Sequence, residues 1–297
     1  MNGILCMNKP QQFTSFDVIG KLRGILHMKR LGHTGTLDPM ATGVLPVLVG
    51  TATKACDILP NQDKTYRAAV QFGKATDTLD IWGCLTQQYP DMHVTEAQLR
   101  AVLPDFMGEI TQLPPMYSAV SVNGKRLYEL ARKGEIVERP SRMVTVYDIT
   151  IEAFEEAEQT AVLTIACGKG TYIRTLLSDI GQRLGGDAVM TALTRTAACG
   201  YSLEQCLTFE QVAAAVEDGS MADKLLPTDS LFSAHPKLYL NAVQERMFCN
   251  GVKLDLMRLR DLQEGQDVYT VYGVQNGFLG TAIADRERQE LRIGKRF

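Results

Sequence analysis

The sequence lacks the features that would place a chain in a membrane or direct it out of the cell. No uninterrupted apolar run approaches the roughly 20 residues that span a bilayer. The opening residues, MNGILCMNKP, show no basic stretch followed by an apolar one, so we expect no signal peptide. We therefore expect a cytoplasmic protein with no membrane partner.

Metal-binding patterns are also missing. The seven cysteines include no C-x-x-C pair, and none of the four histidines lies near a cysteine pair. A structural zinc site needs closely spaced pairs of ligands. We therefore expect no metal, and we expect the cysteines to be reduced, buried thiols that pack as small apolar side chains.

Basic charge is scarce in total but grouped in position. Lysine and arginine number 31 against 34 acidic residues, a net charge of −3 that argues mildly against nucleic acid. The basic residues nevertheless form three groups: Lys9, Lys21, Arg23, Lys29 and Arg30; Lys125, Arg126, Arg132, Lys133, Arg139 and Arg142; and Arg286, Arg288, Arg292, Lys295 and Arg296. One group alone is typical of a solvated face, but three leave room for a phosphate-binding surface.

The periodicity of the apolar residues predicts a chain of alternating strands and helices. With 297 residues, 45% of them hydrophobic, we expect one large or two ordinary globular domains. The predicted strands cover residues 3–7, 44–49, 64–72, 116–122, 142–154, 159–167 and 189–199. The predicted helices cover residues 16–28, 51–59, 95–107, 124–134 and 209–216, with another ending at residue 184. Short alternating runs and frequent glycines beyond residue 236 predict a small all-β unit.

One stretch, GHTGTLDPMATGVLPVLVG at residues 32–50, combines a polar loop with an apolar run. Glycines permit unusual backbone angles and Pro39 fixes its own, so the first half predicts a loop with one carboxylate, Asp38. The second half predicts a buried strand. A polar loop anchored to a buried strand can present a reactive group, although a simple surface turn would read the same way.

Two other motifs could indicate a functional site, but the evidence for each is weaker. The tetrapeptide GKGT at residues 168–171 is not a P-loop, because Gly170 follows the lysine directly and Thr164 occupies the position of the first glycine. Asp77 and Asp80, in the loop GKATDTLDIWG, could ligate a metal. Capping a turn through the side chain is the commoner use of such aspartates.

Five blocks of the sequence resemble one known family. The loop GHTGTLDPMATGVLP resembles the catalytic-aspartate motif of the tRNA pseudouridine-55 synthases of the TruB type. Other blocks resemble further motifs of that family in the same order: MNKPQQFTSFDVIGKLR, KTYRAAVQFGKATDTLDIWG, PPMYSAVSVNGKRLYELARKG and GKGTYIRTLLSDIG. The resemblance covers residues 1–200 closely and the C-terminal β unit more loosely, as a PUA-like RNA-binding domain.

The resemblance implies an architecture and a reaction. It implies an α/β (α+β) catalytic domain with a mixed, largely antiparallel sheet over residues 1–233, followed by a small β-barrel-like PUA domain over residues 234–297. It also implies an isomerase that breaks the N1–C1′ bond of a uridine in the tRNA T-loop, at position 55, and rejoins the base through C5. Nothing is oxidised or hydrolysed, so we expect no cofactor. The expected partner is the T-stem-loop of tRNA, with no obligate protein partner.

Three residues match the catalytic positions of this family. Asp38 matches the catalytic aspartate, and its exact chemical role stays open. Tyr66 matches the tyrosine that stacks on the flipped uracil and is a candidate for removing the C5 proton; without the resemblance it would be an ordinary core aromatic. Arg174 matches the arginine that pairs with the aspartate and keeps it ionised, although it would otherwise read as a surface arginine.

Four more residues match substrate-binding positions. His33 resembles the residue that fills the space left by the flipped base, although a lone histidine is more often structural. Tyr172 and Leu193 match residues that line the uracil pocket, whereas Lys9 is interpreted as a structural residue that shapes the wall beside the site. The chain departs from the family at Thr194 and at Ser121, which replace basic residues, so we expect weaker or less salt-sensitive tRNA binding.

Three functions remain open from the sequence. The first is a stand-alone tRNA pseudouridine synthase. The second is a tRNA-binding and folding chaperone in which catalysis is secondary, and only the first of these two requires Asp38. The third is a guide-RNA-dependent synthase of the dyskerin type, which we expect less because the sequence shows no long basic tails.

Overall fold

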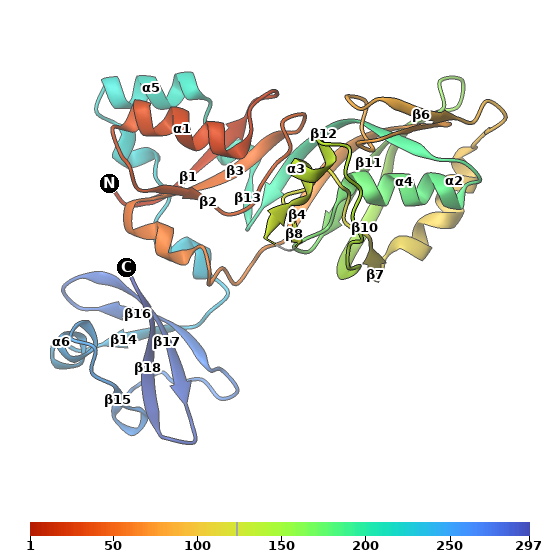
Figure 1. The fold of residues 1–297 in the computed structure, drawn as a ribbon. Coiled ribbons are helices and arrows are strands. Elements are labelled where there is room, and N and C mark those ends of the chain that lie inside the picture. Colours follow the sequence, from red (N-terminus) through yellow and green to blue (C-terminus); the bar gives the residue numbers. More distant parts are fainter. Residues whose placement is uncertain (123) are drawn as a thin grey trace.

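A mixed β-sheet forms the larger part of the protein (Figure 1). The structure, a computed structural model, describes residues 1–122 and 124–297; Asn123, part of one family-like block, lies outside the described residues. The strands of this sheet are β1 (Gly3–Lys9), β2 (Leu31–His33), β3 (Thr42–Val49), β4 (Lys64–Phe72), β7 (Gly108–Gln112), β10 (Arg142–Glu155), β11 (Thr160–Cys167), β12 (Ala188–Ala198) and β13 (Tyr201–Ser202).

The order of these strands confirms the predicted sheet type. The main path is β1-β3-β12-β4-β11-β10-β7, with β2 beside β3 and β13 beside β12. The ladders along it are antiparallel except between β12 and β3, where Thr194 and Arg195 pair in parallel with Thr42 and Gly43. The short parallel ladder therefore brings β12 beside the start of β3, directly after the Asp38 loop.

Helices cover this sheet at both ends. They are α1 (Ser15–Leu26) and α5 (Phe209–Glu217) at one end, and α2 (Glu96–Val102) and α4 (Ile173–Arg183) at the other; α3 (Leu127–Ala131) is drawn between these two groups in Figure 1. The apolar sides of α1 and α5 pack with β1 and β3, whereas α4 and α2 pack with β4, β11 and β12 (Figure 1). Thr14 caps the N-terminus of α1: its hydroxyl accepts from the Asp17 amide, and the Asp17 carboxylate accepts from the Thr14 amide.

A second, curled sheet follows at the C-terminus and has a core of its own. Its order is β14-β16-β17-β18-β15, where β14 is Lys237–Leu240, β15 Leu254–Asp255, β16 Val268–Gly273, β17 Gly277–Asp285 and β18 Glu290–Arg296. The half-barrel shape is consistent with a PUA-like domain. An aromatic cluster joins it to the preceding segment, since Phe232 lies 6.2 Å from Phe278 and 5.7 Å from Phe297 between ring centroids.

Several local predictions were wrong. The helix predicted over 51–59 is shorter, a 3₁₀ helix at Gly50–Ala55, and the predicted strand over 116–122 is reduced to β8 (Ser121–Val122). The carbonyls of Ser118 and Val120 instead accept from the first amides of α3, so they are not available for a sheet. The predicted helix over 124–134 is correspondingly limited to α3, preceded by β9 (Lys125–Arg126), which pairs with β8.

Some elements were not predicted. The loop over 73–83 contains β5 (Lys74–Thr76), which pairs with β6 (Leu85–Gln88), and the C-terminal unit contains a helix, α6 (Ala242–Cys249). Asn241 caps α6 together with Gln244, a signal that was readable in the sequence. The cysteines are free thiols in the described residues, but Cys56, Cys84 and Cys249 are exposed, contrary to the expectation of burial. None of the described helices is long and apolar enough to cross a membrane.

Candidate active site

Asp38 lies on the loop that connects β2 to β3. The loop is tied to its surroundings at several points: the Thr34 amide donates to the Pro46 carbonyl at 3.1 Å, and the Leu37 amide donates to the Ser15 hydroxyl at 2.8 Å. Leu37 itself is buried in the core beneath α4. The Asp38 side chain remains 37% exposed, so the loop holds one carboxylate at the surface of a packed core.

Arg174 lies in the first turn of α4 and contacts Asp38. Its Nη2 is 2.9 Å from Asp38 Oδ2, and its side chain is only 5% exposed. The same guanidinium donates from Nη1 to the Thr78 carbonyl at 2.8 Å and from Nη2 to the Tyr117 carbonyl at 2.9 Å. One arginine therefore joins α4 to three loops, and it holds a positive charge against the Asp38 carboxylate.

Asp80 completes this arrangement and was not identified as a site residue from the sequence. Its Oδ1 accepts from the Trp82 amide at 3.0 Å, and Asp77 Oδ1 accepts from the Cys84 amide at 2.8 Å, so both aspartates cap turns as expected. The second oxygen of Asp80, Oδ2, lies 3.8 Å from Arg174 Nη1. Only the tertiary fold reveals this contact, because no sequence spacing connects residues 80 and 174.

Tyr66 lies on β4, in the core cluster that also contains Leu37 and Met40 of the Asp38 loop. It is 6% exposed, and burial raises its pKa to about 12. At neutral pH its side chain is therefore a neutral phenol. This favours contact between the ring and a base over removal of a proton by a tyrosinate.

Two buried cations lie near the Asp38 loop. Lys9, on β1, is fully buried and donates to the carbonyls of Pro10 at 2.9 Å and Phe13 at 2.6 Å. Burial lowers its pKa to about 8, while the nearby Asp38 carboxylate acts in the opposite direction. Arg195, on β12, is also fully buried and donates to carbonyls of the Asp38 loop. Leu193 on this strand was predicted as a site residue from the sequence, but Arg195 was not.

The other predicted residues surround this centre. His33 ends β2, is half-buried, and its pKa is lowered by burial and by the charge of Arg195; its Nδ1 lacks a hydrogen-bond partner among the described residues. Leu193 is buried in the same core cluster as Tyr66. Tyr172 precedes α4, its backbone is held by the Gln112 side chain, and the guanidinium of Arg142 lies 5.3 Å from its ring centroid.

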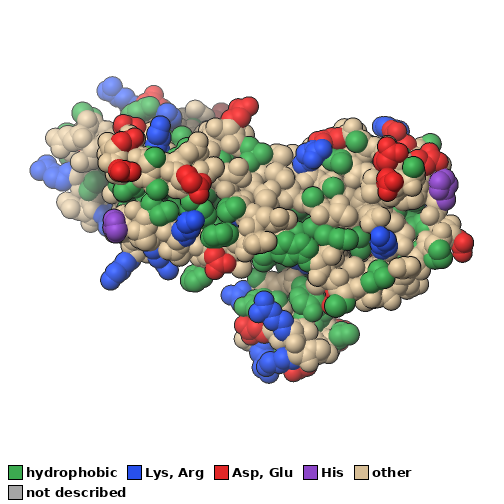
Figure 2. Space-filling model, turned by 90° about the horizontal axis from the view of Figure 1, so that it is seen from above, with side chains coloured by type: hydrophobic (Ala, Val, Ile, Leu, Met, Phe, Trp, Pro, Cys, Tyr) green, Lys and Arg blue, Asp and Glu red, His purple; other side chains and the backbone are tan. Residues whose placement is uncertain are grey.

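Charge is distributed unevenly over the molecule. Figure 2 shows acidic side chains gathered at the end that carries β6 and α2, whereas the opposite end and the C-terminal sheet carry lysines and arginines together with acidic side chains. The segment that contributes the Tyr117 carbonyl to Arg174 also carries exposed basic residues: Lys125, Arg126, Arg132 and Lys133. A polyanion therefore meets less repulsion on the side of the molecule away from the acidic end.

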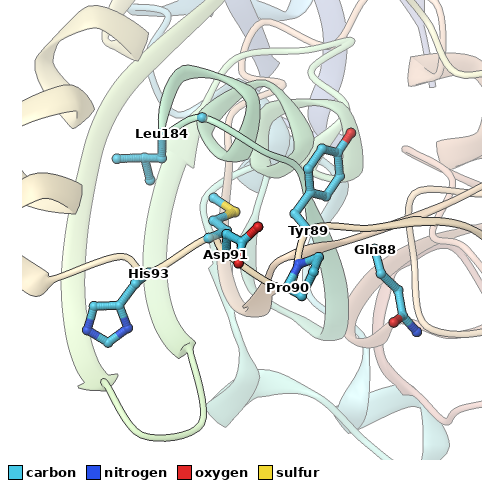
Figure 3. A pocket seen from close by; sticks show the side chains of 8 residues that line it. Gln88, Tyr89, Pro90, Asp91, His93 and Leu184 are labelled. Atoms are coloured by element: carbon cyan, nitrogen blue, oxygen red, sulfur yellow. The ribbon is translucent and has the colours of Figure 1, made fainter.

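A hollow of about 380 Å³ lies elsewhere and does not belong to this centre. It is lined by residues 88–93 together with Leu184 and Gly185 (Figure 3). These last two residues follow the C-terminus of α4, about 15 Å along the helix axis from Arg174. The residues predicted for the site do not line it, so its size alone does not identify the functional site.

Comparison with known proteins gives a consistent result. Residues 23–173 match the family described as TruB family pseudouridylate synthase, N-terminal domain, and residues 174–233 match the tRNA pseudouridylate synthase B C-terminal domain. A protein of Acaryochloris marina named tRNA pseudouridine synthase B is 42% identical over 94% of both chains. A protein of the same name from Clostridium tetani is 38% identical over 97% of both chains.

Solved structures show the same fold at lower identity. An H/ACA RNP bound to a substrate RNA containing 2′-deoxyuridine includes a chain that superposes with a TM-score of 0.75 at 22% identity, over 99% of this chain and 84% of that one. A Cbf5-Nop10-Gar1 complex gives the same TM-score and coverage at 23% identity. These likenesses establish the architecture.

Proposed function

The chain belongs to the TruB family of pseudouridylate synthases, and on that premise we propose that Asp38 acts directly on a uridine in the tRNA T-loop, at position 55. The protein is a pseudouridine synthase, an isomerase that converts uridine to pseudouridine in tRNA. The single observation that supports Asp38 as the reacting group is its position, half-exposed on an anchored loop and 2.9 Å from a buried arginine.

The isomerisation balances without any added reactant. The N1–C1′ bond of the uridine breaks, a C5–C1′ bond forms, C5 loses its proton and N1 gains one. A carboxylate can form a covalent intermediate and leave again, or it can accept a proton from the ribose. Either role requires an ionised Asp38. Arg174 places its positive charge 2.9 Å from this carboxylate.

The base must leave the stack before Asp38 can reach it, because a uracil inside a folded RNA loop is stacked and shielded. In our proposal the flipped uracil lies against Tyr66 and Leu193, and Tyr172 borders the same space. Tyr66 is 6% exposed in the protein alone, so side chains that cover it must move when the base enters. We assign to His33, half-buried at the end of β2, the role of filling the position that the base leaves in the RNA.

RNA binding is assigned to two parts of the chain. Residues 113–142 contribute exposed lysines and arginines close to the Tyr117–Arg174 contact, and their charge suits the phosphate backbone. We assign residues 1–233 to the catalytic domain and residues 234–297 to a PUA-like RNA-binding domain. On this account the T-stem-loop of tRNA is the partner, with no obligate protein partner and no cofactor.

The decisive test uses an unmodified tRNA transcript that carries tritium at C5 of its uridines, incubated with the protein alone. We expect one tritium released per tRNA, and no release from a transcript with cytidine at position 55. Release that persists after this change would contradict the proposed target. Tight binding without release would favour the RNA-folding function, and release that requires an added guide RNA would favour the dyskerin-type function.

A further inference from the structure

Arg195 is a buried cation whose role the proposed chemistry does not include. Its side chain is fully buried, and its guanidinium has no carboxylate within ion-pair distance among the described residues. Burying an arginine is costly unless its donors are satisfied, since the charge loses its hydration. In this structure, main-chain carbonyls around the Asp38 loop accept the hydrogen bonds that compensate for burial of the charge.

The Nε, Nη1 and Nη2 nitrogens of Arg195 all donate hydrogen bonds to main-chain carbonyls in or beside the Asp38 loop. Nε donates to Val44 at 2.7 Å, Nη2 to Gly35 at 3.1 Å and Nη1 to Thr36 at 3.3 Å. Gly35 and Thr36 precede Asp38 on the loop, and Val44 follows it on β3. The guanidinium therefore links the two ends of the segment that carries the carboxylate.

The backbone of Arg195 also constrains the start of β3, which follows the Asp38 loop. Arg195 pairs in parallel with Gly43 at the start of β3, and a Cβ added to Gly43 would lie 2.2 Å from the Arg195 carbonyl oxygen. Gly43 also has a φ of +103°, a conformation that other residues rarely adopt. Directly after the Asp38 loop, the chain therefore passes close to the backbone of Arg195, the residue whose side chain also holds the loop.

The same residue is adjacent to Tyr66. Arg195 and Tyr66 are directly opposite each other in the antiparallel ladder of β12 and β4, so their side chains lie on one face of the sheet. The charge of Arg195 lowers the pKa of His33 and opposes the effect of burial on Tyr66. One guanidinium is therefore in electrostatic contact with several of the proposed site residues.

We propose that Arg195 is a positioning residue that sets the path of the Asp38 loop, and hence the placement of Asp38 relative to Tyr66, through its hydrogen bonds to Gly35, Thr36 and Val44. The inference rests on the proposed function for its catalytic consequence. The hydrogen bonds themselves are independent of that function. The Ser15 hydroxyl holds the opposite side of the loop, at Leu37, so the loop is fixed from two directions.

Lysine cannot replace this arginine. A planar guanidinium reaches three acceptors that lie in different directions, whereas an ammonium group concentrates its donors at one point. A lysine buried beside the existing cations would also lose its proton more readily, because burial disfavours its charged form. The buried Lys9 nearby shows this effect, since its pKa is lowered to about 8.

Hydrogen exchange on the wild-type protein gives the first test. The amides of Thr34, Leu37 and Ala41 donate to the Pro46 carbonyl, the Ser15 hydroxyl and the Asp38 carbonyl. If the loop is clamped, these amides should exchange at least about 100-fold more slowly than in an unstructured peptide. Exchange at the unprotected rate would overturn the proposal without any variant being made.

The second test compares Arg195→Lys with the control Arg67→Lys. Arg67 lies on the neighbouring strand β4 with its side chain 54% exposed and contacts Glu152. Single-turnover rates on unmodified tRNA, expressed per folded enzyme, should fall about 100-fold for Arg195→Lys, as expected for a misplaced catalytic group. The control should stay within about twofold of wild type. The Kd for tRNA should change less than about threefold, and faster exchange should be confined to residues 34–41.

These outcomes distinguish a role of Arg195 in positioning the Asp38 loop from a general contribution to stability. A wild-type rate per folded Arg195→Lys enzyme, or faster exchange spread evenly over the chain, would overturn the proposal. If Arg195→Lys does not fold, Arg195→Gln retains one donor group and the same expectations apply. A wild-type protein without turnover would contradict the proposed function, while the exchange of the loop amides would still report on the clamp.

Discussion

Arg174 lies 2.9 Å from Asp38, yet it does not form the two-pronged pair that an arginine can make with a carboxylate. Nη2 lies beside Asp38 Oδ2 and also donates to the Tyr117 carbonyl, while Nη1 donates to the Thr78 carbonyl. Asp80 Oδ2 lies 3.8 Å from Nη1. The arginine therefore organises three loops around the carboxylate as well as balancing its charge.

Replacing Arg174 by lysine should damage both catalysis and stability. Lysine keeps the charge but cannot reach Asp38, Thr78 and Tyr117 together, so we expect kcat to fall about 100-fold. A carbonyl left unpaired in the interior costs roughly 1–3 kcal/mol, so the free energy of unfolding should also fall. Arg183→Lys is the matched control, because Arg183 ends the same helix, is exposed and contacts only Asp105 among the described residues. Equal kcat values for Arg174→Lys and Arg183→Lys would show that the guanidinium of Arg174 is not needed.

Asp80→Asn should have a smaller effect. The asparagine carbonyl can still cap the Trp82 amide, so the turn is kept while the negative charge facing Arg174 is lost. We expect kcat to fall about tenfold, because the guanidinium is then free to shift toward Asp38 or away from it. The control is Asp77→Asn in the same loop, which is exposed and caps the Cys84 amide. Rates that fall equally for both would assign the effect to the turn and not to the charge.

The lowered pKa of Lys9 predicts how the free energy of unfolding depends on pH. Its pKa in the folded protein is lowered to about 8, against 10.5 for a free lysine. Between these values the unfolded chain binds more protons than the folded one, so the stability contribution of Lys9 rises with pH. Below about pH 8 both states are protonated and the burial penalty is fully present.

Urea unfolding of wild type and Lys9→Met from pH 7 to 10 tests this sign. Their difference in unfolding free energy should be constant below pH 8, and above it should shift in favour of wild type by up to about 1.4 kcal/mol per pH unit. Other titrating groups cancel in the difference. A constant difference across the whole range would mean that the pKa of Lys9 is not lowered.

Much of the fold followed from local patterns in the sequence. The strand over 64–72 was predicted with its observed bounds, because the alternation of apolar and polar side chains depends on neighbouring residues only. The segment 116–122 failed for the opposite reason. It has the composition of a strand, but its carbonyls accept from α3, a partner that no local pattern indicates.

The site divides in the same way. Asp38 stood out in the sequence because glycines and a proline surround a single carboxylate. Asp80 and Arg195 did not stand out, because their importance comes from contacts with residues far away along the chain. Asp80 contacts Arg174, and Arg195 contacts Thr36, which is 159 positions away. Contacts of this length depend on the order of strands in the sheet, which the periodicity of single segments does not determine.

The most direct measurement compares wild type with Asp38→Asn on tRNA tritiated at C5 of its uridines. Asparagine keeps the size of the side chain and removes the ionised carboxylate, so folding and tRNA affinity should be preserved. The account predicts one tritium released per tRNA by wild type, at least about 1,000-fold slower release by Asp38→Asn, and Kd values within about threefold of each other. Release by Asp38→Asn at a rate close to wild type would contradict the central role assigned to Asp38.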